Sequence, residues 1–426
     1  MIDQVVVTGM GMVCSLGHSV SEVWRALLEG KGGIGPIKGF DAGGFDCRVA
    51  AQVRGLGPSE LGIHTRDARI MDIHSFMLVK CAHDALVQAR LDKASIPREA
   101  IGFFVGMGMV DYDVKDLLPS VLKALDSEGA IDYDKFYSGG YREIYPLWPL
   151  SMLNNITLCQ IAISLDIRGE NTVFSPHADS GAQAIAEGVE TILEKKARVV
   201  LAGGVSEKVS PLSLARAHLS NMLNTSDDPK EMRCRPFSSR RKGTILGEGC
   251  GILALELRSS ADRRGVAYEA VIGGYGNSCE INEEKSGPTV RAVSYAMKEA
   301  MAKAEIEPSG IDLIIAHGDG TYSGNRNETE AIHQVFSKCL DRVYVFSSKG
   351  ALGDLLAGSP ALDTILAICM IESGMVPRTL NSDPKESGTG FNVFGDRPLR
   401  ASPKMVMINS RSYEGQCASL IIEACA

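Results

Sequence analysis

Two distant segments of this chain follow one pattern. Residues 173–193 read VFSPHADSGAQAIAEGVETIL, and residues 345–366 read VFSSKGALGDLLAGSPALDTIL. Each segment predicts a short strand, a tight turn of small residues and then a helix. Two weaker pairs occur in the same order along the chain: 5–11 with 270–276, and 103–108 with 313–320. Three ordered pairs favour a duplicated unit, and we place its halves at residues 1–258 and 259–426.

Strand-like apolar runs alternate with amphipathic stretches in both halves. Examples are IGFFVGMG, ARVVLAGGV and GCGILALEL in the first half, and IDLIIAHGDG and KMVMINS in the second. Continuous apolar strands separated by helices are typical of an α/β fold whose sheet is covered on both faces.

Charge and cysteine content limit the classes of function. The net charge is −8 and no basic tract occurs, so we expect neither nucleic acid nor a membrane as a partner. The N-terminal run lacks the basic region of a signal peptide, and no uninterrupted apolar run reaches the ~20 residues of a membrane span. The 11 cysteines form no C-x-x-C pair, which indicates reduced thiols in a cytoplasmic protein without a metal site.

Four segments together resemble the β-ketoacyl synthase family. They are VVVTGMGMVCSLG (5–17), RCRPFSSRRKGTILGEGCGILALE (233–256), AHGDGT (316–321) and SSKGALGDLLAG (347–358), in family order and spanning most of the chain. The resemblance implies the thiolase-like fold, a duplicated five-layer α/β/α/β/α arrangement that dimerises across its central sheet. Family members condense acyl chains with one Cys and two His, a thiolate nucleophile and donors to developing oxyanions.

The resemblance assigns these catalytic positions to residues that have changed here. The nucleophile position, in HADSGAQAI, is Ala178, and the second His position, in GDLLAG, is Asp354. The first His and the family Lys remain as His317 and Lys349. The terminal Gly-Phe-Gly-Gly loop, which gates the pocket, reads SRSYEGQ (410–416) and keeps only Gly415. We therefore expect no catalytic residue in this degenerate site.

Within the family, this pattern is similar to the chain length factor of bacterial type II polyketide synthases. That subunit lacks the nucleophile, forms a heterodimer with an active ketosynthase, and shapes the tunnel for a polyketide or polyene chain. The implied partners are the ketosynthase and an acyl carrier protein whose phosphopantetheine presents the substrate, with no other cofactor. The resemblance places tunnel or gate residues at Tyr112, Leu117, Tyr413 and Gly415. It places residues 141–165 at the dimer interface, although a plain core helix explains their composition as well.

Other interpretations remain open from the residues. The chain could be an enzyme of the same fold that uses His317 and Asp354, with Ser180 as a possible nucleophile, for decarboxylation, acyl transfer or hydrolysis. It could also be a scaffold or homodimer that binds acyl chains. A strand reaching His177 would turn that side chain away from Ala178, and Ser180 would cap the following helix. The basic run at 233–242 fits either a carrier-protein patch or a structural arginine cluster.

Overall fold

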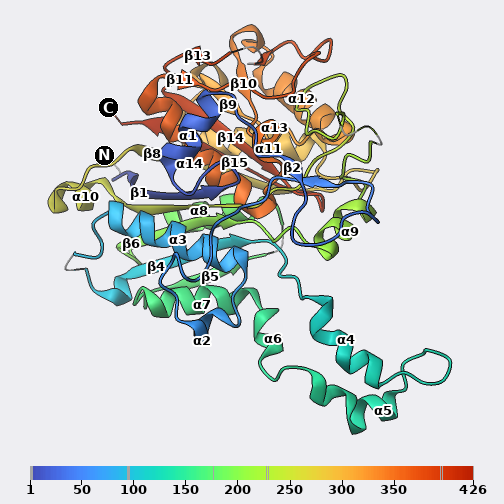
Figure 1. Cartoon of the computed structure of the whole chain (residues 1–426). Helices are drawn as coiled ribbons and strands as arrows, with labels where there is room; N and C mark the ends of the chain where they lie inside the picture. Colours follow the sequence, from blue (N-terminus) through green and yellow to red (C-terminus); the bar gives the residue numbers. More distant parts are fainter. Residues whose placement is uncertain are drawn as a thin grey trace.

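One large sheet organises the protein. The computed structural model describes residues 3–93, 96–175, 177–226, 228, 230–393, 395 and 397–425. Over these residues, eleven strands lie side by side in the order β12-β10-β9-β14-β15-β8-β1-β7-β6-β4-β5 (Figure 1). Their bounds are β1 Val5–Cys14, β4 Ile101–Met107, β5 Asn171–Phe174, β6 Val199–Val205, β7 Gly249–Leu257, β8 Ala270–Cys279, β9 Leu313–Ile315, β10 Tyr344–Phe346, β12 Asn392–Val393, β14 Met405–Arg411 and β15 Gln416–Ala424.

The two halves of the sheet repeat one topology. In the first half the spatial order is β5-β4-β6-β7-β1, and in the second half it is β10-β9-β14-β15-β8. Each half therefore places its third, second, fourth, fifth and first strands in that order, with the same parallel and antiparallel pairs. The two first strands join the halves through Val6↔Val271 and Val7↔Ala270. The predicted duplication is confirmed, whereas the exact boundary at residue 258 stays a prediction.

Helices cover both faces and fill the space between the halves. Helices α8 and α14 pack on strands of both halves, while α3 and α7 pack on the first half and α11 on the second, where it also contacts α12. This arrangement is the expected five-layer α/β/α/β/α fold. Helix bounds are α1 Val20–Leu28, α2 Thr65–Ala68, α3 Ile73–Gln88, α7 Asn154–Ser164, α8 Ser180–Leu193, α9 Pro211–Leu219, α10 Arg258–Arg264, α11 Val290–Lys303, α12 Tyr322–Phe336, α13 Lys349–Leu352 and α14 Ser359–Ser373.

Alternation along the strands explains the layers. In β6, Val200 and Ala202 join the central core with α8 and α14, whereas Val199 and Leu201 join the outer core with α3 and α7. Successive strand residues point to opposite faces, so a run that is apolar throughout must be covered on both sides. The strands predicted from continuous apolar runs are buried in this way.

The central helix α14 belongs to the one stretch of the described residues that could span a membrane by length and composition. The stretch Leu356–Ser373 is long and apolar enough to cross a membrane, and it is the one such stretch within the described ranges. However, 78% of it is buried inside the protein, as the core helix of a globular fold would be.

A close approach of backbones sets the start of α8. A Cβ on Gly106 of β4 would lie 2.2 Å from the backbone nitrogen of Gly181, in the first turn of α8. Only glycine allows this contact without displacing the backbone. The N-terminus of α8 is therefore fixed against the end of β4.

A long arm, residues 109–153, projects from the first half. It holds α4 (Val114–Lys123), α5 (Tyr133–Ser138), a 3-10 turn (Gly140–Glu143) and α6 (Trp148–Ser151). Figure 1 shows this arm extending away from the layered body, beyond α7. The helices α4 and α5 pack on the 3-10 turn and on each other.

Candidate degenerate active site

Ala178 lies in the turn between β5 and α8. Strand β5 ends at Phe174 and α8 begins at Ser180, so Ala178 sits at the N-terminus of a 14-residue helix. Such a terminus favours negative charge and often presents a nucleophile or an oxyanion donor. Here the side chain is a buried methyl group, and the Ala178 N–H donates to Ser412 Oγ at 3.3 Å. The Ala178 N–H is therefore already hydrogen-bonded to a hydroxyl group of the same chain.

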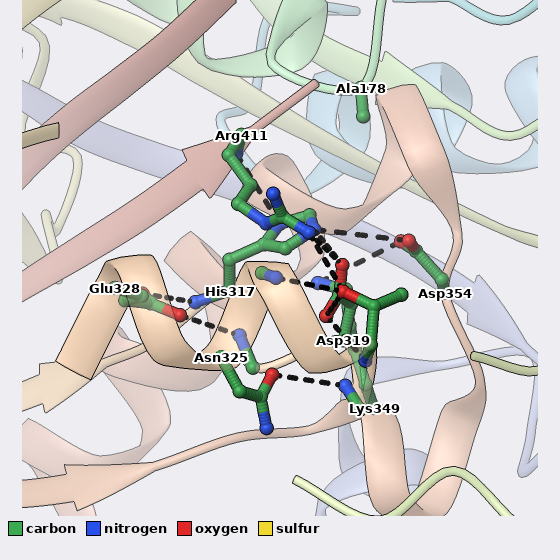
Figure 2. A network of polar contacts seen from close by, with 12 residues as sticks. Ala178, His317, Asp319, Asn325, Glu328, Lys349, Asp354 and Arg411 are labelled. Atoms are coloured by element: carbon green, nitrogen blue, oxygen red, sulfur yellow. Dashed lines mark hydrogen bonds and ion pairs between the residues drawn. The ribbon is translucent and has the colours of Figure 1, made fainter. Parts of the chain in front are cut away.

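The second half contributes the other site residues from neighbouring parallel strands. His317 follows β9, Lys349 and Asp354 lie at the start and just past the end of α13 after β10, and Arg411 ends β14. The carboxyl ends of parallel strands share one edge of a sheet, which is where α/β proteins build their sites. Figure 2 shows these side chains converging below Ala178.

His317 is buried and its proton faces two carboxylates. The Arg411 backbone N–H donates to His317 Nδ1 at 3.3 Å, so the proton of the neutral ring is assigned to Nε2. His317 Nε2 lies 3.7 Å from Asp319 Oδ2 and 3.9 Å from Asp354 Oδ2. Burial, together with the Lys349 ammonium, holds the pKa of His317 well below its usual range, which keeps the ring neutral.

Glu328 fixes the backbone of the His317 turn. Its two carboxylate oxygens accept from the backbone N–H groups of His317 and Gly318, each at 2.9 Å (Figure 2). Asn409 adds a hydrogen bond to the same carboxylate at 3.4 Å. These bonds fix the backbone from which the imidazole projects.

A buried ion pair joins Asp319 to Arg411. One Arg411 guanidinium nitrogen, Nη2, donates to Asp319 Oδ2 and, at 3.0 Å, to Thr321 Oγ1. Although burial opposes ionisation, Arg411, His317 and the Thr321 N–H hold the pKa of the Asp319 carboxyl well below its usual range. A Cβ on Gly324 would lie 1.9 Å from Arg411 Nη2, and one on Gly287 would lie 2.4 Å from Nη1. Two glycines therefore make room for this guanidinium.

Lys349 and Asp354 form a second, looser pair. Lys349 Nζ lies 3.8 Å from Asp354 Oδ1, and both side chains are about 1% exposed or less. Asp354 Oδ1 also accepts from the Leu356 N–H at 3.1 Å and the Ser359 hydroxyl at 3.2 Å. The carboxylate is thus held by its own loop, at the position that the resemblance assigns to the second His.

The turn after β14 is tied to the start of α8. Ser412 donates to Glu414, whose Oε2 lies 3.2 Å from His177 Nδ1, and Gln416 Nε2 lies 3.1 Å from His177 Nε2. The prediction that His177 points away from Ala178 is wrong, because β5 ends at Phe174 and both residues line one cavity. The expected Ser180 cap is also wrong: Ser180 is the first helical residue and its hydroxyl donates to the His177 carbonyl at 2.5 Å.

A cavity of about 570 Å³ opens beside Ala178. Its walls include the acidic side chains Glu207, Glu284, Asp319, Asp354 and Glu414, against the two arginines Arg216 and Arg411. Burial raises the pKa of Glu207 to about 7, so this carboxyl is partly protonated near neutrality. Even so, acidic groups outnumber the cationic ones in the cavity wall.

The predicted tunnel and gate residues fall in two places. Tyr413 lines the cavity beside Ala178. Gly415 has φ +102°, and a Cβ there would lie 2.7 Å from the Ile281 backbone nitrogen, so the turn needs glycine. Tyr112 and Leu117 lie in the arm, where Tyr112 stacks edge-on against Trp148, and neither lines this cavity. Their role as tunnel walls stays a prediction.

The basic run 233–242 divides into buried and exposed residues. Arg235 pairs with Glu231 and Arg241 pairs with Glu386, so these two arginines are buried structural residues. Arg233, Arg240 and Lys242 remain exposed.

Sequence reasoning missed Asp319, Arg411, Ser412 and Glu414. Asp319 lies in AHGDGT, one of the segments that carried the resemblance, whereas Arg411, Ser412 and Glu414 lie in SRSYEGQ, the altered terminal loop. Neither charged residue stands out within its own segment, so no local signal pairs Asp319 with Arg411.

The duplicated five-layer fold, with its site at the start of α8 and the ends of β9, β10 and β14, defines a thiolase-like protein of the ketosynthase type. The β-ketoacyl synthase N-terminal domain model matches residues 3–261, and the β-ketoacyl synthase C-terminal domain model matches residues 269–383. The chain belongs to the β-ketoacyl synthase family.

Similar proteins cover the whole chain at low identity. The 3-oxoacyl-(acyl-carrier-protein) synthase 2 of Coxiella burnetii is 27% identical over 98% of both chains, and that of Synechocystis is 28% identical over 98% of this chain and 97% of its own. A solved structure described as the ishigamide ketosynthase/chain length factor matches with a TM-score of 0.87 at 26% identity over 100% of both chains. A complex of a type II polyketide synthase acyl carrier protein with its ketosynthase, AntDE:AntF, matches in fold with a TM-score of 0.83 at 22% identity over 100% of both chains.

Proposed function

We propose that this chain is a chain length factor, a non-catalytic subunit that pairs with an active ketosynthase. In this role it shapes the tunnel in which a polyketide or polyene chain grows on the phosphopantetheine of an acyl carrier protein. The observation that carries the proposal is the environment of Ala178, where the nucleophile is absent and the remaining catalytic groups bind one another.

Three features of the site oppose ketosynthase chemistry. Ala178 has no atom that an acyl group could modify. The Ala178 N–H, which would stabilise an oxyanion, is bound to Ser412 Oγ at 3.3 Å. The Nε2 proton of His317 faces Asp319 and Asp354 at 3.7 and 3.9 Å, so it is not directed at a substrate oxygen.

Charge opposes decarboxylation as well. A malonyl carboxylate would enter a cavity in which acidic side chains outnumber the arginines. Two like charges 4 Å apart repel by about 4 kcal/mol at an effective dielectric of 20. The alternative enzyme that uses His317 and Asp354 therefore lacks support from the geometry. The geometry also gives no support to the alternative in which Ser180 is the nucleophile, because the Ser180 hydroxyl donates a hydrogen bond to the His177 carbonyl.

The outer strand supports a subunit role. Strand β5 is the last strand of the sheet on its side, and its first two residues are exposed. An exposed edge strand offers unpaired backbone groups to another chain. Similarity to a ketosynthase/chain length factor at 26% identity fits a partner of the same fold.

An activity comparison tests the proposal. The active ketosynthase encoded nearest to this chain would be assayed for condensation with acyl and malonyl carrier proteins, alone and with this chain. We expect condensation only when both chains are present, and Tyr112→Ala or Leu117→Ala to change product length without abolishing condensation. Condensation or malonyl decarboxylation by this chain alone would refute the proposal.

A further inference from the structure

One oxygen of a buried carboxylate near Ala178 lacks a hydrogen-bond donor. Asp354 Oδ1 accepts from the Leu356 N–H and the Ser359 hydroxyl, but Oδ2 accepts no hydrogen bond from the residues that the structure describes. The Asp354 side chain is fully buried and lines the cavity beside Ala178. Buried acceptors are normally satisfied by protein, water or a ligand, because an unsatisfied one costs free energy. Asp354 Oδ2 therefore marks a place where the cavity can bind a donor.

The neighbouring carboxylate of Asp319 has its donors already. Asp319 Oδ2 accepts from the Arg411 guanidinium, and Oδ1 accepts from both the backbone N–H and the hydroxyl of Thr321, at 2.9 and 2.8 Å. Of the two carboxylates that face His317, Asp354 is therefore the one with an oxygen available to a ligand.

His317 places a donor opposite this free oxygen. Because the Arg411 N–H occupies Nδ1, the ring proton is assigned to Nε2, which lies 3.9 Å from Asp354 Oδ2 (Figure 2). This separation is too long for a direct hydrogen bond, but one oxygen about 2.8 Å from both atoms would bridge it. That oxygen must accept from Nε2–H and donate to Oδ2. A hydroxyl does both, whereas a carbonyl or an oxyanion only accepts.

The charges around this gap favour a neutral group. Lys349 Nζ lies 3.8 Å from Asp354 Oδ1, and the Arg411 guanidinium pairs with Asp319, so each carboxylate already has a cation beside it. A further cation would be repelled by these two positive groups, and an anion would be repelled by the acidic side chains of the cavity wall. A hydroxyl group carries no charge and meets neither repulsion.

Another part of the cavity wall is apolar. Met222, Leu246 and Leu356 line the same cavity as the Ala178 methyl group. The cavity volume of about 570 Å³ is in the range of small-molecule sites, which combine an apolar wall with a few placed polar groups. A ligand that has both a hydroxyl group and a hydrocarbon chain would use both parts of this cavity.

We propose that the cavity beside Ala178 binds a hydroxyl-bearing acyl chain, whose hydroxyl oxygen bridges His317 Nε2 and Asp354 Oδ2. This inference rests on the proposed function, because the ligand is taken to be an intermediate of chain growth that binds here without being condensed. It adds the class of ligand, which is a hydroxyacyl chain and not an oxoacyl chain. Because Nε2 carries the ring proton, His317 acts as a donor in this complex and does not remove a proton from the chain.

A set of matched probes tests the ligand class. The N-acetylcysteamine thioesters of 3-hydroxybutyrate, 3-oxobutyrate and butyrate share one handle and differ only at the third carbon of the acyl chain. Their dissociation constants would be measured by ligand-observed NMR on the full chain, alone and in its complex with the ketosynthase. We expect the hydroxy probe to bind at least about tenfold more tightly than the other two, because only its hydroxyl satisfies both buried groups.

The variant Asp354→Asn locates the effect in this cavity. The amide keeps the shape of the side chain, but it loses the charge and can donate as well as accept. We therefore expect the preference for the hydroxy probe to fall below about threefold. The matched control, Asp92→Asn, changes an exposed residue that does not line the cavity and should keep the wild-type preference. The comparison of probes on the wild type tests the inference even where the Asp354 variant does not fold.

The outcomes separate this inference from the proposed function. Equal binding of the hydroxy and oxo probes, or no binding of the hydroxy probe, overturns the inference and leaves the subunit role intact, with water alone bridging the two groups. A preference that Asp354→Asn leaves unchanged also overturns the inference, since the hydroxyl would then bind elsewhere. Loss of water from the hydroxy probe, or transfer of its acyl group to this chain, would refute the non-catalytic role, whereas the binding preference would still support the ligand class.

Discussion

Restoring the missing nucleophile tests how far the site has departed from ketosynthase chemistry. We predict that Ala178→Cys alone does not restore condensation. Such a thiol would lie at the start of α8, beside a backbone N–H already bound to Ser412 and near an imidazole whose proton faces Asp319 and Asp354. The nucleophile would return without its oxyanion donors.

The size of the deficit follows from two separate groups. Loss of one oxyanion donor costs about 10²–10³ in rate. A carboxylate about 4 Å from developing negative charge costs about 4 kcal/mol at an effective dielectric of 20, or about 10³ in rate. Because the two effects multiply when they act independently, the variant would condense about 10⁵–10⁶-fold more slowly than an active ketosynthase.

Intact-protein mass spectrometry and product analysis measure this deficit. The variant would be mixed with acyl carrier protein and malonyl carrier protein, with Ala178→Ser as the control that lacks a thiol. The triple change Ala178→Cys/Asp354→His/Ser412→Gly should gain at least about 10³ over the single variant. Condensation by Ala178→Cys within a hundredfold of an active ketosynthase would refute the reasoning.

Three further predictions concern stability. Arg411→Met should lower the free energy of unfolding in urea by about 3–5 kcal/mol, because it leaves the Asp319 carboxylate buried and unpaired. The double variant Arg411→Met/Asp319→Leu should recover most of this loss, and equal stability of the single and double variants would contradict the prediction. Gly324→Ala should lower the free energy of unfolding by about 1–3 kcal/mol, because the added Cβ displaces the Arg411 guanidinium. The loss should be smaller when Arg411 is already Met, and strictly additive losses in the double variant would contradict the prediction. Burial raises the pKa of the Glu248 carboxyl to about 7, above its value in the unfolded chain, so its contribution to the free energy of unfolding is present below pH ~4.5 and is lost as the pH rises through about 7. The free energy of unfolding, measured from pH 5 to 8, should therefore depend less on pH in Glu248→Gln than in the wild type. An unchanged dependence on pH would contradict this prediction.

The architecture could be predicted from the sequence because each strand, turn and helix of the repeated unit has its own local sequence pattern. The pairs 5–11 with 270–276 and 103–108 with 313–320 fall on β1 with β8 and on β4 with β9, which are equivalent strands of the two halves. Continuous apolar runs, tight turns and helices survive as local signals even at low overall similarity.

The details of the site depended on contacts that local patterns do not encode. The Asp319–Arg411 pair joins residues 92 positions apart, and each residue alone reads as an ordinary charged side chain. His177 was misplaced because strand β5 stops three residues earlier than the apolar pattern suggests. From the sequence, parts of the arm were interpreted as tunnel wall and parts as core or dimer interface. How much of the arm is exposed follows only from the three-dimensional structure.

Native mass spectrometry of this chain co-expressed with the ketosynthase encoded nearest to it tests the central claim most directly, after incubation with acyl carrier protein. The account predicts a one-to-one complex in which the acyl mass appears on the ketosynthase alone. An acyl mass on this chain would contradict it and would place a nucleophile somewhere other than position 178.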